Sequence, residues 1–195
     1  IHASTAASGD CRIRGLNAPF LLQIPMRLIF GLLKPRNPVL GTELSGEITD
    51  AGKDVNKFKK GDKVFAMTGM KFGAYAEYIC IPENGVLALK PENITYLEAS
   101  AVAFGGTAAL HYLRKRNIKK DDKVFIYGAS GSVGSSSVQI AKAFGAEVTG
   151  VCSSANLEMV KYLGANKVLD YTKENFIKKL ESYDIIFDAV GKISK

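Results

Sequence analysis

The sequence predicts an α/β protein that contains a β-rich first domain followed by part of a doubly wound parallel sheet. Up to about Lys90, short strand-like runs are separated by glycine and proline, which is typical of a compact and mostly antiparallel β domain. From Asp121 onward, strand-like and helical patterns alternate, and this alternation predicts parallel strands joined by helices. We therefore expect one domain over residues 1–95 and a second over residues 96–195.

The first domain is expected to hold four β segments, because apolar residues alternate with polar or small ones between turn-forming residues. These segments cover residues 41–50, 62–68, 74–82 and 86–90. The apolar stretch Pro19–Leu33 precedes all of them, is too short to span a bilayer, and is broken by Pro25 and Arg27. It is either an apolar wall over a substrate cleft or ordinary core, and we favour core.

A long helix is expected over residues 96–116, where Thr95 and Glu98 resemble a capped N-terminus. Within this segment, Phe104–Thr107 is interpreted as a tight turn near the domain boundary, where a cleft would form. The second domain continues with strands at 122–127, 147–151, 167–171 and 184–190, joined by helices at 132–144, 156–163 and 174–180.

The parallel sheet of the second domain is expected to have the strand order 3-2-1-4. Its fourth strand, residues 184–190, would then present an open apolar edge. Because such an edge invites pairing with another chain, we expect a homo-oligomer or a further piece of the protein to cover it, or else a chain of low stability.

The segment Lys123–Val151 carries the most specific motif, since an apolar strand ends in three spaced glycines that open a helix and lead to a second strand. Gly128 allows a tight turn, Gly131 lets backbone N–H groups approach phosphates, and Gly134 lets the helix pack close to the sheet. The spacing excludes a Walker phosphate loop, because no Gly-Lys-Ser/Thr follows, and the alternative is a glycine-rich turn without a ligand. The pattern predicts a Rossmann-type dinucleotide site made of Gly128, Ala129, Ser130, Gly131, Ser132, Val133 and Gly134.

The end of the second strand of this unit indicates which dinucleotide is preferred. NAD-binding proteins place Asp or Glu here, about twenty residues beyond the glycines, against the ribose 2′-hydroxyl. This chain instead has Cys152, Ser153 and Ser154, which leave room for a 2′-phosphate, so we expect a modest preference for NADPH. A cationic clamp is missing at Ala155 and Asn156, and Lys161 or Tyr171 is expected to compensate in part. Ala189 and Val190, at the end of the fourth strand, and Thr107 complete the expected cofactor-binding residues.

Composition and charge narrow the classes of function. The 195-residue chain is 47% hydrophobic and carries a formal net charge of +7. Its lysines are scattered and lack interleaved aromatic residues, so a solvated basic surface is favoured over nucleic-acid binding. The three cysteines, Cys11, Cys80 and Cys152, form no CxxC pair, which argues against a disulfide framework and fits a reducing cytoplasm.

With these residues in view, the chain resembles the medium-chain dehydrogenase/reductase superfamily, and specifically its zinc-less quinone-oxidoreductase-like branch. The resemblance implies a GroES-like first domain, a Rossmann second domain, and a protein that extends beyond this sequence at both ends. The segments that carry it are 1–15, 35–66, 73–82, 99–113 and 127–134.

The resemblance also implies that no metal is bound. Zinc-dependent members of the superfamily have their ligands at the positions of Ala7, Thr42 and Ala103, and these residues cannot form a tetrahedral N/S site. Glu43 remains, but one carboxylate does not make a zinc site. Without a Lewis acid, hydride transfer to an already electrophilic carbon is expected, so the substrate would be a small apolar quinone, enone or enal.

Three residues are catalytic candidates by their family positions, namely Thr107 and, more weakly, Asp10 and Thr42. Many relatives have asparagine or another polar residue at Ala7, so no defined oxyanion donor is expected, and solvent would supply the proton. Two alternatives stay open. One is an enoyl reductase that acts on a thioester, and the other is a dinucleotide-sensing or RNA-binding protein without turnover.

Overall fold

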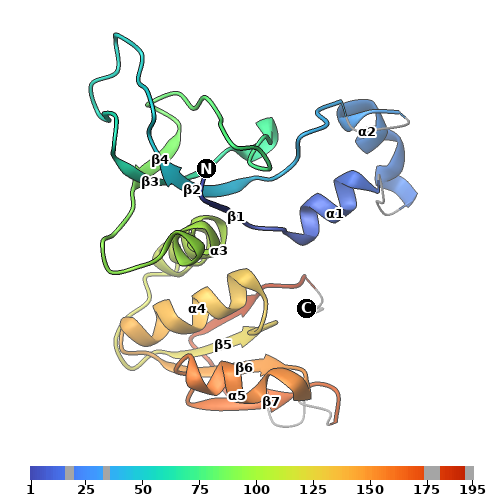
Figure 1. Ribbon diagram of the computed structural model, residues 1–195. Coiled ribbons are helices and arrows are strands. Elements are labelled where there is room, and N and C mark those ends of the chain that lie inside the picture. Colours follow the sequence, from blue (N-terminus) through green and yellow to red (C-terminus); the bar gives the residue numbers. More distant parts are fainter. Residues whose placement is uncertain (16–19, 33–35, 174–180, 192–195) are drawn as a thin grey trace. The chain divides into compact units, whose positions relative to one another are not determined.

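The computed structural model describes residues 1–15, 20–32, 36–173 and 181–191 (Figure 1). The chain divides into two compact units, Ile1–Ala103 and Phe104–Lys195, each of which is described by itself. The division falls inside helix α3 (Tyr96–Lys115). Among the described residues, none of the helices combines the length and the apolar character needed to cross a membrane.

The first unit is built on an antiparallel sheet in the order β1-β2-β3-β4. Strand β2 is buried along most of its length because it lies between two partners, and its Leu44 packs with Ala66 and Ala74 in a small apolar core. The strands are β1 (Ala3–Ser4), β2 (Glu43–Glu47), β3 (Lys63–Met67) and β4 (Val86–Leu89).

Residues 74–82 form no strand, contrary to our prediction. The backbone N–H groups of Ala74 and Tyr75 donate instead to the carbonyl oxygens of Gly41 and Leu40, in the loop before β2. The apolar residues Ile79 and Ile81 pack against the small core from this loop. Alternating apolar residues therefore serve here to cover the sheet without extending it.

Two helices of the first unit were not predicted. Helix α1 (Ser8–Arg14) has Ala7 as its N-cap residue, and the N–H of Ala7 donates to the Asp10 carboxylate. Helix α2 (Phe20–Phe30) contains Pro25, and Ile24, Leu28 and Ile29 on it are 73%, 56% and 59% exposed. These three side chains do not take part in a core of the described residues, and the role of the stretch as an apolar wall over a substrate cleft stays a prediction.

The second unit contains a parallel sheet in the order β7-β6-β5-β8. This confirms the predicted order 3-2-1-4, with the first strand of the unit between the second and the fourth. The predicted helix at 174–180 lies outside the described residues. The elements after α3 are β5 (Lys123–Tyr127), α4 (Ser132–Ala143), β6 (Glu147–Cys152), a 3-10 turn (Ser154–Asn156), α5 (Leu157–Tyr162), β7 (Lys167–Asp170) and β8 (Ile185–Asp188).

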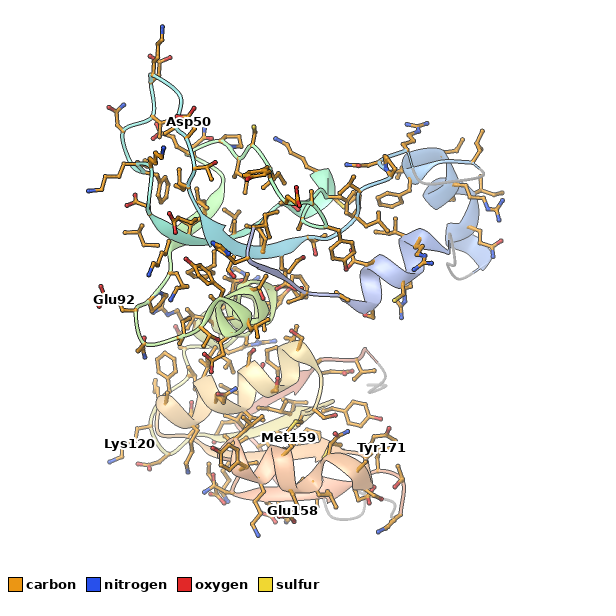
Figure 2. All side chains as sticks on the ribbon, in the orientation of Figure 1. Asp50, Glu92, Lys120, Glu158, Met159 and Tyr171 are labelled. Atoms are coloured by element: carbon orange, nitrogen blue, oxygen red, sulfur yellow. The ribbon has the colours of Figure 1, made fainter. Side chains whose placement is uncertain are left out.

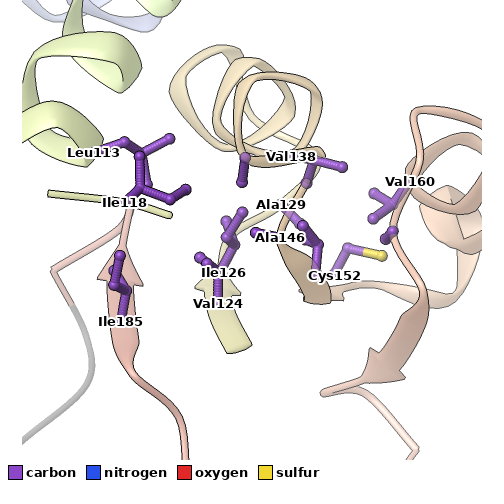
Figure 3. Packing of buried hydrophobic residues seen from close by; sticks show 13 residues of the cluster. Leu113, Ile118, Val124, Ile126, Ala129, Val138, Ala146, Cys152, Val160 and Ile185 are labelled. Carbon is purple, nitrogen blue, oxygen red and sulfur yellow. The ribbon is translucent and has the colours of Figure 1, made fainter. Parts of the chain in front are cut away.

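Both faces of this sheet are apolar, as a parallel sheet requires. Helices α4 and α5 lie on one face (Figure 1), where Val138 and Val160 pack with Val124 and Val148 of the strands. Figure 3 shows this main core from close by. The opposite face carries a second buried cluster of Phe125, Val151 and Leu169.

Helix α3 begins with the predicted cap, in which Thr95 Oγ1 accepts the N–H of Glu98 and the Glu98 carboxylate accepts the N–H of Thr95. The helix then runs unbroken through Phe104–Thr107, so our expectation of a tight turn there was wrong. Gly105 is buried, and a Cβ atom on it would come within 2.6 Å of Ser132 Oγ. The glycine serves close packing of α3 on the start of α4.

Candidate functional site

The glycine turn that follows β5 is held in a conformation that suits glycine. Gly128 has a φ of 78°, and a Cβ atom on it would collide with the Val190 side chain. The N–H groups of Gly128 and Ala129 donate to the carbonyl oxygen of Val151 at 3.0 and 2.9 Å. The turn is therefore tied to the neighbouring strand β6 and cannot open without breaking these bonds.

Helix α4 starts directly at this turn. A Cβ atom on Gly134 would collide with the carbonyl oxygen of Gly128, so the first turn of the helix packs directly on the glycine turn. Gly131 caps the helix with extended backbone, and a Cβ atom on it would have Gly128 O as its nearest neighbour, at 3.6 Å. The first N–H groups of a helix have no partner within it, so this exposed end suits a phosphate group.

The turn after β8 lies beside the glycine turn. Ala189 N–H donates to Tyr127 O at 3.0 Å, and Asp188 Oδ1 accepts the N–H groups of Val190 and Gly191 at 2.9 and 2.8 Å. The structure thus brings Ala189 and Val190 together with Gly128 at the point where the strand order reverses. Ligands of open α/β sheets bind in the crevice at such a point.

Cys152, at the end of β6, does not offer its thiol to a ligand. Its side chain is 1% exposed and packs in the core with Ala129 and Val160 (Figure 3). Burial, with a smaller contribution from the Asp170 carboxylate, raises the pKa of the thiol. The thiol is therefore turned into the core, whereas Ser153 and Ser154, which follow it, are more exposed.

A carboxylate that we did not predict stands next to these serines. Asp170, the last residue of β7, accepts hydrogen bonds from Ser154 Oγ at 2.5 Å and from Thr172 Oγ1 at 2.6 Å. These bonds lower the pKa of Asp170. The end of β6 itself carries no acidic side chain, and this carboxylate comes instead from the end of the adjacent strand. The signal in the sequence is an aspartate that ends an apolar run.

Tyr171 and Lys173 extend the same edge. Tyr171, labelled in Figure 2, follows β7, is 49% exposed, and lies with its ring centroid 6.4 Å from that of Tyr127. Lys173 is exposed, and its charge contributes to the lowered pKa of Asp170, although the sequence alone did not point to it. Lys161, the cation that we did consider, is an exposed residue of α5.

In the first unit, Asp10 and Thr42 occupy neighbouring segments. Asp10 is 5% exposed, and its two oxygens accept the N–H groups of Ala7 and Gly41 at 2.9 and 3.1 Å. Thr42 follows Gly41, and its carbonyl oxygen accepts the N–H of Thr68. The bonding of Asp10 is that of a residue that fixes the start of α1 to the loop before β2.

Two further polar residues join this cluster. Thr5 Oγ1 donates to the buried Glu43 carboxylate at 2.6 Å, and the Tyr75 hydroxyl donates to Thr5 O at 3.0 Å. Partial burial, followed by a hydrogen bond and repulsion from Asp10, raises the pKa of Tyr75 to about 12. Tyr75 was not predicted, because only the fold brings it against Gly41.

Thr107 belongs to the second unit, on α3. Its side chain is exposed, and its hydroxyl donates to Phe104 O at 3.1 Å, one turn earlier in the helix. No group of three or more His, Cys, Asp or Glu side chains that could hold a metal ion occurs in the part of the chain that the structure describes.

Known proteins with similar sequences and structures share this arrangement of domains. The family described as "Alcohol dehydrogenase GroES-like domain" matches residues 9–91, and the family described as "Zinc-binding dehydrogenase" matches residues 132–194. The solved quinone oxidoreductase from Coxiella burnetii superimposes with a TM-score of 0.84 at 30% identity, over 98% of this chain and 58% of that one. The chain belongs to the medium-chain dehydrogenase/reductase superfamily. Within this superfamily, the chain belongs to the quinone-oxidoreductase-like branch.

Two plant members of the superfamily are also similar to this chain. The 2-methylene-furan-3-one reductase of Solanum lycopersicum is 36% identical over 170 residues, and the chloroplastic NADPH-dependent alkenal/one oxidoreductase of Arabidopsis thaliana is 34% identical over 170 residues. Each alignment covers 83% of this chain and 44% of the relative. The chain thus spans less than half the length of these two proteins.

The side chains at the superfamily's zinc positions do not suit that metal here. Ala7 and Ala103 carry no donor atom, and a threonine hydroxyl at Thr42 is a poor substitute for the imidazole or thiolate that zinc prefers. The nearby Glu43 carboxylate accepts a hydrogen bond from Thr5. This donor set argues against zinc, although the matched family is described as zinc-binding.

Proposed function

We propose that the protein is an NADPH-dependent oxidoreductase that reduces quinones, or the activated C=C bonds of enones and enals, without zinc. The observation that carries the proposal is the glycine turn. Gly128 and Gly134 have no room for a side chain there, and the turn leads directly into the exposed start of α4. The names of the similar quinone and alkenal oxidoreductases support the substrate class.

A bound nicotinamide dinucleotide would supply a hydride equivalent. In this chain, the pyrophosphate would rest on the N–H groups of residues 132–134, since the N–H of Gly131 already donates to Gly128 O, with Ala189 and Val190 beside it. Ser153, Ser154 and Tyr171 would line the ribose. The positive charge of Lys173 acts at the same edge, which supports a modest preference for NADPH. An already electrophilic carbon would be needed, because Ala7, Thr42 and Ala103 do not offer the donor atoms that hold a Lewis-acidic zinc ion.

The catalytic roles of Thr107, Asp10 and Thr42 remain part of this proposal. The bonding of Asp10 supports a positioning role, since both of its oxygens already accept backbone N–H groups. Thr42 carries a hydroxyl that could donate to a developing oxyanion, and Thr107 could do so by turning its hydroxyl away from Phe104 O. We propose solvent as the source of the proton, because the raised pKa of Tyr75 makes that hydroxyl a weak acid.

The environment of the protein is proposed on similar grounds. Cys11 and Cys80 are free and exposed, which accords with a reducing compartment such as the cytoplasm. Strand β8 ends the described sheet, and its Ile186 is 62% exposed. We propose that another strand covers this edge, from a second copy or from further residues of the same protein. A small apolar substrate is the expected partner, and no nucleic acid is expected.

The test is steady-state oxidation of NADPH by the full-length protein with a quinone, an enone and an enoyl thioester. Turnover with the quinone or enone is expected, and turnover with the thioester alone would favour the enoyl reductase alternative. NADPH binding without turnover on any of these would favour a sensing role. Elemental analysis of the same protein, purified without chelators, should give clearly sub-stoichiometric zinc, and one equivalent per chain would refute the zinc-free chemistry.

A further inference from the structure

Asp170 occupies an unusual place at the edge where the cofactor's adenosine half is proposed to bind. It pairs in register with Cys152, the last residue of β6, and is only 6% exposed. Its carboxylate reaches past the strand ends to Ser154, in the turn that follows β6. The negative charge of Asp170, from β7, is therefore hydrogen-bonded to the turn that follows β6.

The hydrogen bonds of this cluster determine what Ser154 can offer a ligand. A hydroxyl has one proton, and an ionised carboxylate can only accept. Asp170 Oδ2 takes the proton of Ser154, and Oδ1 takes that of Thr172 as well as the Thr172 N–H. The two hydroxyl oxygens lie 2.9 Å apart. With its proton directed to Asp170, Ser154 is left as an acceptor toward solvent or a ligand.

An acceptor beside a fixed negative charge discriminates between the two nicotinamide dinucleotides. A ribose 2′-hydroxyl can donate to Ser154 Oγ, whereas a 2′-phosphate is mostly without a proton to give at neutral pH and carries about two negative charges. The phosphate would also be repelled by the carboxylate, since charges interact strongly where protein partly excludes water. Lys173 opposes this repulsion, because its charge acts on the same carboxylate.

We propose that Asp170 is a selectivity residue that weakens binding of the 2′-phosphate and so limits the preference for NADPH. This inference rests on the proposed dinucleotide site. It assigns to Asp170, on the third strand of the sheet, two effects on the ligand: direct repulsion of the 2′-phosphate, and orientation of the Ser154 hydroxyl. A purely structural role is the competing explanation, since Asp170 also holds the turn at Thr172. A structural defect would weaken all adenosine ligands alike, whereas a selectivity residue changes their ratio.

The experiment uses the full-length protein and two fragments of the cofactors, adenosine 2′,5′-bisphosphate and 5′-AMP, titrated by calorimetry. Asp170→Asn keeps the shape and one acceptor oxygen but removes the charge. We expect it to shift the affinity ratio roughly tenfold toward the bisphosphate, with 5′-AMP affinity changed by less than about twofold. Lys173→Gln, on the same turn, is the matched control and should shift the ratio in the opposite direction.

Each outcome bears on a different statement. An unchanged ratio in Asp170→Asn, with both fragments still bound, would overturn the selectivity role and leave the dinucleotide site intact. Equal loss of both fragments would show that Asp170 is structural. Failure of the unmodified protein to bind either fragment would instead refute the proposed function. In Ser154→Ala, the effect of Asp170→Asn should shrink but persist, because the direct repulsion remains.

Discussion

Gly105 of α3 and Ser132 of α4 lie in such close contact that a Cβ atom on Gly105 would be 2.6 Å from both Ser132 O and Ser132 Oγ. Ser132 is the first residue of the helix that follows the glycine turn. The packing of α3 thus helps to position the N-terminus of α4, where the pyrophosphate is proposed to bind.

Gly105→Ala should therefore destabilise the protein, because the added methyl group meets backbone that cannot move away. We expect a loss of about 1–3 kcal/mol in the free energy of unfolding, measured by urea denaturation. Gly9→Ala is the matched control, since Gly9 is also helical but has no atom within 4 Å of its Cβ position. That variant should gain up to about 1 kcal/mol. Equal effects of the two substitutions would contradict the contact.

Gly131→Ala separates folding from cofactor binding. Gly131 has a φ of −78°, and the nearest atom to its Cβ position is Gly128 O at 3.6 Å, an ordinary van der Waals contact, so alanine fits the free protein without strain. A methyl group there would keep phosphates away from the start of α4. We expect an unchanged unfolding midpoint and at least a tenfold loss of NADPH affinity, on the order of 1.4 kcal/mol, by fluorescence titration. Unchanged affinity would show that no phosphate approaches at Gly131.

Cys152→Asp should lower the free energy of unfolding. This substitution is therefore unsuitable as a test of cofactor preference. The new carboxylate would lie in the main core, next to the existing charge of Asp170. Burying an unpaired charge costs about 3 kcal/mol or more. Cys152→Ala is the control and should lose less, because it removes only apolar contacts. A variant with aspartate that is as stable as the alanine variant would mean that this strand end opens to solvent.

The cap of α3 makes stability depend on pH. Hydrogen bonds from Thr95 lower the pKa of Glu98 below its ordinary value of 4.5. A lowered pKa in the folded state means that the stabilisation is present above pH 4.5 and is lost as the pH falls through the lower folded value. The stability difference between the protein and its Glu98→Ala variant should therefore narrow from about pH 7 to about pH 3 in urea unfolding curves. A constant difference would show that the charge contributes nothing.

Local patterns predicted the second unit well, because each of its strands is a continuous apolar run and each helix has its own apolar period. The strand order followed from the glycine turn at Gly128 and the alternation after it. The site at the end of β6 was predicted less well. The burial of Cys152 depends on its pairing with β7, and Asp170 reaches Ser154 only across that pairing.

The first unit was harder to predict for a related reason. Its polar cluster joins Thr5, Asp10, Glu43 and Tyr75, which are far apart in sequence and carry no shared motif. Helix α1 starts at an alanine, so the usual hydroxyl or carboxylate of an N-cap residue was missing as a signal. The cap is completed by Asp10 from inside the helix.

The contact of Gly128 with Val190 has a consequence for the order of events during synthesis. The glycine turn is made early, but the residue against which it rests follows the last described strand. Closing a contact between such distant segments is slow relative to local helix formation. A nascent chain should thus complete helix α4 well before it can hold a dinucleotide, and competence to bind should appear only once β8 has left the ribosome and docked.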